Sequence, residues 1–140
     1  MTSFLSSFTP YDIPRYGLVR LPEVVISKEQ KAEVGLQPNA SNYEFLVEIA
    51  RKGFMAKGGL IDKARYTEYG TRAKYELEIF EELGFTDYVL LVWLVINKAR
   101  DLGVFIDYGR GSCAGSLIFW LLGLTGVDSV AKELLFERFV

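Results

Sequence analysis

The chain has 140 residues, of which half are hydrophobic and 14% are aromatic, and its formal net charge is −2. This length fits one domain, and this much apolar surface excludes a disordered chain. A single cysteine, Cys113, excludes an internal disulfide, and the absence of histidine excludes histidine-based catalytic triads and histidine metal sites.

The first 42 residues hold all four prolines and show little periodicity. We expect residues 1–42 to form an extended N-terminal segment, with a strand at residues 23–27 (EVVIS). Met1 is followed by polar residues rather than by a basic and then an apolar run, so no signal peptide is visible. These features favour a reducing cytoplasm as the compartment.

From Tyr43 onward the apolar residues recur near helical spacing, which predicts three helices in succession. The first is expected over residues 43–57, with Ser41 or Asn42 as its cap and Gly58–Gly59 as its stop. The second is expected within residues 66–83 and ends before Gly84. The third, residues 86–102, begins at Thr86 or Asp87 and ends before Gly103. Because it is apolar on most sides as far as Asn97, we expect it to be buried.

The remaining elements surround a glycine-rich turn. Residues 104–106 (VFI) predict a short strand, residues 112–124 predict another buried helix, and Asp128 is expected to cap a last helix over residues 129–139. The predicted fold class is therefore α-rich α/β, with helices packed on a short strand that needs a sheet from elsewhere. The two most apolar runs, residues 88–96 and 116–124, are nine residues long each. A helix needs about 20 residues to span a bilayer, so no membrane role is expected.

The stretch YGRGSCAGS, residues 108–116, has the composition of an anion site. A glycine turn before a helix start offers backbone N–H groups, and Arg110 and Ser112 add donors suited to phosphate. The Walker pattern is excluded because no Gly-Lys-Ser/Thr triplet follows Gly109. The spacing G-x-G-x-x-x-G is also one residue longer than the dinucleotide fingerprint. On spacing alone, glycines that permit tight packing remain an equal alternative.

Residues 108–139, YGRGSCAGSLIFWLLGLTGVDSVAKELLFERF, resemble the palm segment of the C-family bacterial replicative DNA polymerases, the DNA polymerase III alpha subunits. That family carries Gly-Pro-Gly-Arg-Gly-Ser-Ala-Ala-Gly-Ser, a buried helix, an aspartate and then LLFERF. The upstream residues 75–104 resemble the family as well, and the likeness covers roughly residues 40–140. It implies that residues 43–140 are a helical region and the N-terminal part of a palm of the beta-type nucleotidyltransferase kind.

The resemblance also implies roles for single residues. Gly111 and Ser112 would hold the triphosphate of the incoming dNTP, Gly109 and Arg110 would flank that pair, and Ser116 would lie one turn into the helix, where helix packing is the favoured alternative. Cys113 stands where the family commonly has alanine, so we expect a small buried side chain rather than a nucleophile. Asp107-Tyr108 replaces the family's Gly-Pro, which leaves the strength of nucleotide binding open.

The family's catalytic aspartates follow LLFERF in a Pro-Asp-x-Asp-x-Asp pattern, and the given sequence ends at Val140. We therefore expect no catalytic or metal-ligating residue in this chain. Mg²⁺ would be bound mainly by residues outside it. The expected partners are the polymerase segment with the aspartates, primer–template DNA and dNTP, in a bacterial or phage-infected cell. Such a part of a larger or split polymerase would be inactive alone. The alternatives are a stand-alone mononucleotide-binding module and a purely structural interaction fragment.

A basic stretch runs from Ile49 to Lys74. It suggests contacts with the DNA backbone, which would be sensitive to salt, against the alternative of a solvated helix face. The residues proposed for such contacts are Arg51, Lys52, Lys57, Lys63 and Arg65.

Overall fold

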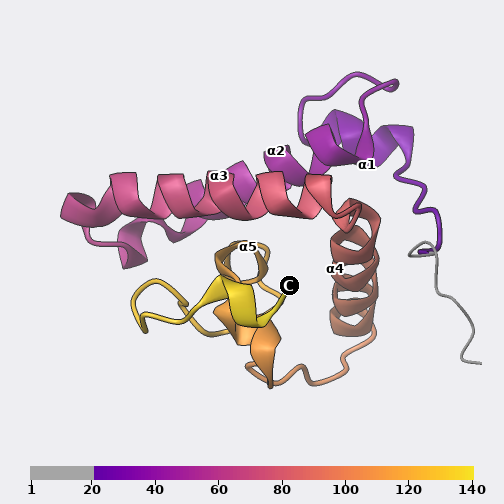
Figure 1. Cartoon of the computed structure of the whole chain (residues 1–140). Coiled ribbons are helices and arrows are strands. Elements are labelled where there is room, and N and C mark those ends of the chain that lie inside the picture. Colours follow the sequence, from indigo (N-terminus) through magenta and orange to yellow (C-terminus); the bar gives the residue numbers. More distant parts are fainter. Residues whose placement is uncertain (1–20) are drawn as a thin grey trace, which may run out of the picture.

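Helices form nearly all the regular structure of the computed structural model, which describes residues 21–140 (Figure 1). The α-helices are α1 (Lys28–Glu33), α2 (Asn42–Lys57), α3 (Tyr66–Glu82), α4 (Thr86–Asp101) and α5 (Leu117–Leu121). Single 3₁₀ turns occur at η2 (Gly58–Leu60), η3 (Lys63–Arg65), η4 (Ser112–Gly115) and η5 (Phe136–Arg138). The predicted α-rich character is therefore confirmed.

Local sequence signals place the ends of the long helices correctly. Ser41 caps α2 in a reciprocal capping box with Glu44, and Gly58 ends that helix. Gly84 and Gly103 follow α3 and α4 with φ angles of +70° and +74°, a backbone region that glycine adopts without steric cost. These signals act over a few residues, which is why the sequence alone locates them.

The expected strands are not formed within residues 21–140. Residues 104–106 lie in a loop, where Val104 is 53% and Phe105 is 86% exposed. At residues 23–27 the backbone shows the alternation of a strand, with Val24 and Ile26 buried and Val25 exposed, but it has no ladder partner there. Both strand predictions were wrong for the same reason: a strand needs a neighbour to pair with.

Three further expectations differ from the structure in detail. The start of α4 has no side-chain cap, because the Asp87 carboxylate accepts hydrogen bonds from the Val24 amide (3.1 Å) and from Asn42 Nδ2 (2.7 Å) instead. Residues 129–139 do not form one helix: Asp128 caps a turn, and only η5 follows. The segment expected to be extended contains α1, while residues 1–20 lie outside the described residues.

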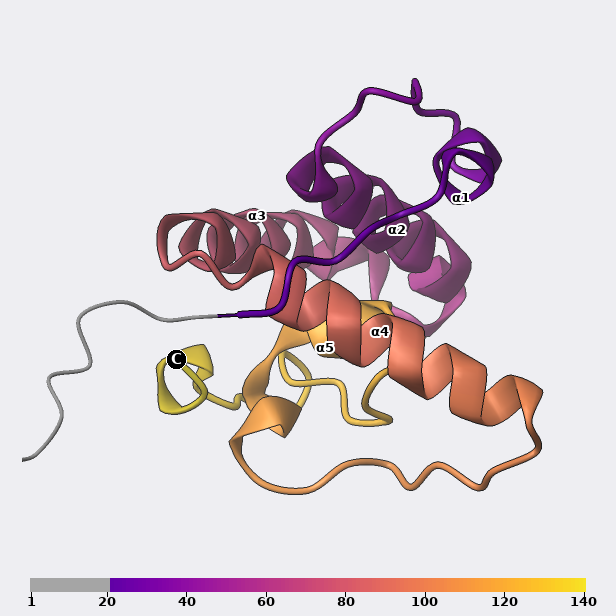
Figure 2. The ribbon, with the colours of Figure 1, turned by 90° about the vertical axis from the view of Figure 1, so that its right-hand side faces the viewer.

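The core centres on α5, which lies beneath α2 and α3 (Figures 1 and 2). All five of its residues are buried, as predicted, but the helix is shorter than the expected range 112–124, because Ser112–Gly115 form the 3₁₀ turn η4, which starts at an exposed serine. In α4, by contrast, only Val89 and Leu90 are fully buried and five further apolar residues are half-buried against the core, so its expected burial is confirmed only in part. Within the described part of the chain, no helix has both the length and the apolarity needed to cross a membrane.

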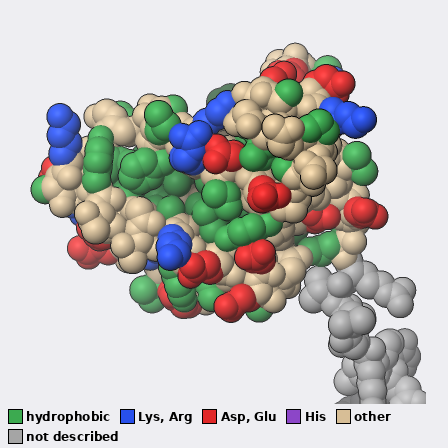
Figure 3. All heavy atoms as spheres, turned by 90° about the horizontal axis from the view of Figure 1, so that it is seen from above, with side chains coloured by type: hydrophobic (Ala, Val, Ile, Leu, Met, Phe, Trp, Pro, Cys, Tyr) green, Lys and Arg blue, Asp and Glu red, His purple; other side chains and the backbone are tan. Residues whose placement is uncertain are grey.

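An apolar groove of about 380 Å³ remains open between α2 and α3, with Leu121 of α5 at its base. Figure 3 shows hydrophobic side chains gathered on this face of the molecule, with lysine and arginine side chains beside them. The groove exists because α2 and α3 both pack on α5 more than on each other.

Candidate phosphate-binding site

The glycine-rich loop reaches the surface after a long connection that leaves the end of α4 and runs along one side of the molecule (Figure 2). Its residues Gly109, Arg110, Gly111 and Ser112 are all exposed. Gly109 and Gly111 have φ angles of +105° and +72°, which an L side chain rarely adopts. The two glycines therefore permit a backbone turn that other residues would strain.

Asp107-Tyr108, which differs from the family's Gly-Pro, fits beside this turn. The Gly126 amide donates to the Tyr108 carbonyl oxygen (2.8 Å). A Cβ on Gly126 would lie 1.8 Å from Tyr108 Cδ1, so the tyrosine ring occupies the space that a side chain at Gly126 would fill. Asp107 lies 3.9 Å from the Arg110 guanidinium and is exposed, so it stays on the outer side of the loop.

An open pocket of about 590 Å³ lies against the loop. One wall consists of residues 111–115, including Gly111 and Ser112, and the other of residues 133–138, including Arg138 and Glu133. Two of the predicted site residues, Gly111 and Ser112, therefore share a pocket with Arg138, which was not among the predicted site residues.

The segment FERF explains how Arg138 comes to the pocket. Phe136 is fully buried and Phe139 is half-buried, and their rings pack against Phe80 at centroid distances of 5.4 Å and 6.1 Å. These anchors fix the 3₁₀ turn η5, whose Arg138 remains exposed. The signal that could have found Arg138 is its position between two aromatic residues that must be buried.

The loop also presents backbone donors that have no partner in the part of the chain that the structure describes. None of the hydrogen bonds formed among residues 21–140 uses the N–H groups of Arg110, Gly111 or Ser112. The half-buried Cys113 Sγ donates to the Arg110 carbonyl oxygen at 3.0 Å, which agrees with a small packing side chain. The loop can therefore offer several N–H groups and a hydroxyl to an anion.

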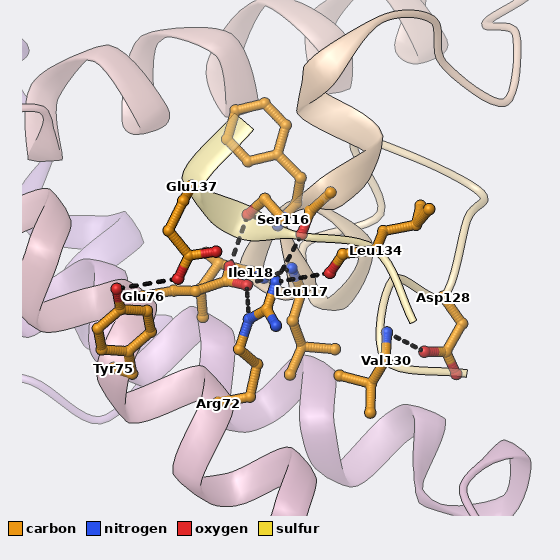
Figure 4. A network of polar contacts seen from close by, with 12 residues as sticks. Arg72, Tyr75, Glu76, Ser116, Leu117, Ile118, Asp128, Val130, Leu134 and Glu137 are labelled. Carbon is orange, nitrogen blue, oxygen red and sulfur yellow. Dashed lines mark hydrogen bonds and ion pairs between the residues drawn. The ribbon is translucent and has the colours of Figure 1, made fainter. Parts of the chain in front are cut away.

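Ser116 does not belong to this exposed surface. It is fully buried, and its hydroxyl donates to the Glu76 carboxylate (Figure 4). Glu76 is also fully buried and accepts four hydrogen bonds, from Arg72 Nε (2.7 Å), Ser116 Oγ (2.8 Å), the Leu117 amide (2.9 Å) and the Ile118 amide (3.0 Å). The Leu117 and Ile118 amides at the start of α5 are therefore bound by an internal carboxylate, so the amides that an anion could reach are those of the glycine turn before it.

Most of the basic stretch is engaged in contacts within the chain. These contacts are Arg51 with Glu48 (2.8 Å), Lys52 with the Glu33 carbonyl oxygen (2.6 Å), Lys57 over the Trp120 ring (4.8 Å to the centroid) and Arg65 with Glu68 (2.7 Å). Lys63 begins η3. A role in DNA-backbone binding stays a prediction.

The described residues do not fit a Mg²⁺ site. Between residues 21 and 140, no three histidine, cysteine, aspartate or glutamate side chains come together as metal ligands. Near the loop, Asp107 lies beside Arg110, and Glu133 is the only acidic residue that lines the pocket.

Comparison with known proteins gives one consistent result. Residues 44–140 match the family described as "Bacterial DNA polymerase III alpha NTPase domain". DNA polymerase III subunit alpha of Streptococcus pyogenes is 42% identical over 87 residues, which are 61% of this chain and 8% of that protein. The same subunit of Bacillus subtilis (strain 168) is 37% identical over 97 residues, 69% of this chain and 8% of that protein. In Helicobacter pylori the identity is 37% over 91 residues, 65% of this chain and 8% of that protein.

This chain therefore spans about 8% of the length of the relatives that it matches. The family match covers 97 of the 140 residues, from 44 through 140. The chain belongs to the bacterial DNA polymerase III alpha family.

Proposed function

We propose that this chain is the part of a DNA-directed DNA polymerase that binds the triphosphate of the incoming dNTP, through Gly109, Arg110, Gly111 and Ser112. The observation that carries the proposal is that Gly111 and Ser112 are exposed and share an open pocket with Arg138, in a chain of this polymerase family. Ser116 is left out, because its hydroxyl is buried and bonded to Glu76.

The chemistry of the loop suits a polyphosphate. The backbone N–H groups of Gly111 and Ser112 can both donate to phosphate oxygens, and the missing Cβ of Gly111 lets an anion approach the turn closely. The guanidinium groups of Arg110 and Arg138 are planar forks that match pairs of phosphate oxygens. Glu133 lines the same pocket, and its negative charge repels an anion there.

The remaining parts of the reaction would come from outside this chain. The Mg²⁺ ions and the aspartates that bind them are proposed to belong to another segment of the polymerase, together with most of the primer–template contacts. The palm-type nucleotidyltransferase fold would then be completed by that segment. In this proposal the 140-residue chain alone extends no primer.

Calorimetric titration of the chain with dATP tests the binding step. Arg138→Gln removes one charge-assisted contact and should weaken binding about tenfold, whereas Glu133→Gln removes the opposing charge and should strengthen it severalfold. Lys74→Gln is the control, because it also removes one positive charge but lies in an exposed ion pair on α3. Equal affinities in all three variants would contradict a site in this pocket.

The same titration separates the alternatives. A stand-alone mononucleotide module would bind dAMP as tightly as dATP, whereas a triphosphate site loses affinity with each phosphate removed. A purely structural fragment would show no binding and no thermal stabilisation by either nucleotide. Mixing the chain with the polymerase segment that carries the aspartates should restore Mg²⁺-dependent primer extension. Extension by the chain alone would refute the proposed division of the site.

A further inference from the structure

Half-buried Arg72, whose side chain is 22% exposed, and fully buried Glu76 form an ion pair within the polar network drawn in Figure 4, and Arg72 contacts both walls of the pocket. Arg72 Nη2 donates to the carbonyl oxygens of Gly115 (3.0 Å) and Leu134 (3.1 Å), which lie on opposite walls. Its Nε pairs with Glu76 at 2.7 Å. One guanidinium thus ties together two segments that are far apart in the sequence.

Glu76 binds the residues that follow the first of these two walls. Its two carboxylate oxygens accept four hydrogen bonds, which is about the full capacity of a carboxylate. Three of these come from Ser116, Leu117 and Ile118, the residues that directly follow the wall bearing Gly111 and Ser112. The start of α5 is therefore locked to α3, and the glycine loop is anchored at its C-terminal end.

Stability alone is a weak explanation for such a pair. Taking the Glu76 charge fully out of water, and the Arg72 charge largely so, costs free energy, and well-packed apolar residues often serve stability as well or better. What the pair supplies is geometry, because its bonds are directional and saturated. Neither Arg72 nor Glu76 lines the pocket, so neither can touch a ligand there.

We propose that Arg72 and Glu76 are positioning residues, which fix the spacing between the wall with Gly111 and Ser112 and the wall with Arg138, and thereby the fit of a triphosphate. This inference deepens the proposed function and rests on it. The walls are already in close contact at Gly115, where a Cβ would lie 2.6 Å from the Leu135 carbonyl oxygen. A small change in their spacing would therefore misalign the donors.

The test uses the 140-residue chain, inorganic triphosphate as the probe and Arg72→Lys as the main variant. A lysine ammonium keeps the charge but lacks the fork needed to reach Glu76 and both carbonyl oxygens at once. We expect the triphosphate Kd to rise at least about tenfold, since small misplacements of binding groups have large effects. The backbone order parameters of Gly111, Ser112 and Leu135 should fall from about 0.85 toward 0.6 in the ligand-free protein.

Two controls separate positioning from stability. Leu46→Ala removes a fully buried side chain of α2 and lowers stability without touching the network, so affinity and order parameters should not change while the protein stays folded. Glu78→Gln alters an exposed carboxylate on the same helix and should change neither. If Arg72→Lys fails to fold, Ser116→Ala removes one bond to Glu76, together with the bond that the hydroxyl accepts from the Phe119 amide, and should give a smaller shift in the same direction.

Gly115→Ala provides an independent perturbation, because it pushes the walls apart and leaves the ion pair intact. It should weaken triphosphate binding as Arg72→Lys does. Wild-type affinity and order parameters in a folded Arg72→Lys variant, or wild-type affinity in Gly115→Ala, would overturn the positioning role alone. Failure of the wild-type chain to bind triphosphate would overturn the proposed function, and the positioning role with it.

Discussion

Two runs of nearly equal apolarity, residues 88–96 in α4 and 116–124 around α5, differ in how fully they are buried. The five residues of α5 are each at most 5% exposed, whereas α4 buries only Val89 and Leu90 and leaves Val95 57% exposed. The short helix is enclosed by α2, α3 and the C-terminal segment, while the long one lies at an edge (Figure 1). Apolarity all round a helix therefore predicts a need for partners, but it does not tell which part of the protein supplies them.

The largest expected effect tests this contrast directly. Ile118→Ala removes a fully buried side chain of α5 and should lower the free energy of unfolding by about 2–5 kcal/mol. Val95→Ala on the exposed side of α4 should change it by less than about 0.5 kcal/mol. Urea denaturation of both variants measures the difference. Similar losses in the two variants would mean that α4 is packed as fully as α5.

The second prediction concerns how closely α2 approaches α5. A Cβ on Gly53 would lie 2.2 Å from the Leu121 carbonyl oxygen, so Gly53→Ala must separate the two helices and should cost about 1–3 kcal/mol.

Gly70→Ala is the matched control for Gly53→Ala. Gly70 lies inside α3, and a Cβ there meets nothing within 4 Å, so alanine should stabilise the helix by about 1 kcal/mol. In thermal unfolding, Gly53→Ala should lower the midpoint temperature and Gly70→Ala should raise it. A stabilising Gly53→Ala would contradict the close α2–α5 contact.

The same contrast shows what the sequence could and could not predict. Helix ends at Ser41, Gly84 and Gly103 follow from interactions within a few residues, so their prediction succeeded. The contact between Ser116 and Glu76 joins residues 40 positions apart, so no pattern of neighbouring residues in the sequence predicts it. The exposure of Gly111 could be expected, but its neighbour Arg138 comes from a segment anchored separately by aromatic packing.

The pH dependence of stability provides a third test, through a tyrosine that packs on α5. Tyr69 is buried beside Trp120, at 6.4 Å between ring centroids, and its hydroxyl donates to Asp128 at 2.7 Å. Burial, and then the hydrogen bond to Asp128, raise the pKa of Tyr69 from 10.0 to about 12.

Because the folded state holds this proton more tightly than the unfolded state, the contribution of Tyr69 is complete below about pH 10. It is lost as the pH rises toward 12. The loss should reach about 1 kcal/mol at pH 11. Denaturation across this range should show a weaker pH dependence for Tyr69→Phe than for the wild type. If the free energy of unfolding changed with pH equally in both proteins, the Tyr69 hydroxyl would be solvated rather than buried.

The smallest effect on stability is expected in the connection that directly follows α4, where apolar side chains are exposed. Leu102 and Phe105 are 68% and 86% exposed, so replacing both by serine should change the free energy of unfolding by less than about 0.5 kcal/mol. Exposed apolar side chains promote association, so the double variant should self-associate less than the wild type in sedimentation velocity experiments. A large loss of stability instead would show that these side chains are packed within the chain. The segment after α4 would then be packed like α5, and the difference in burial between the two apolar runs would not extend to the residues that follow α4.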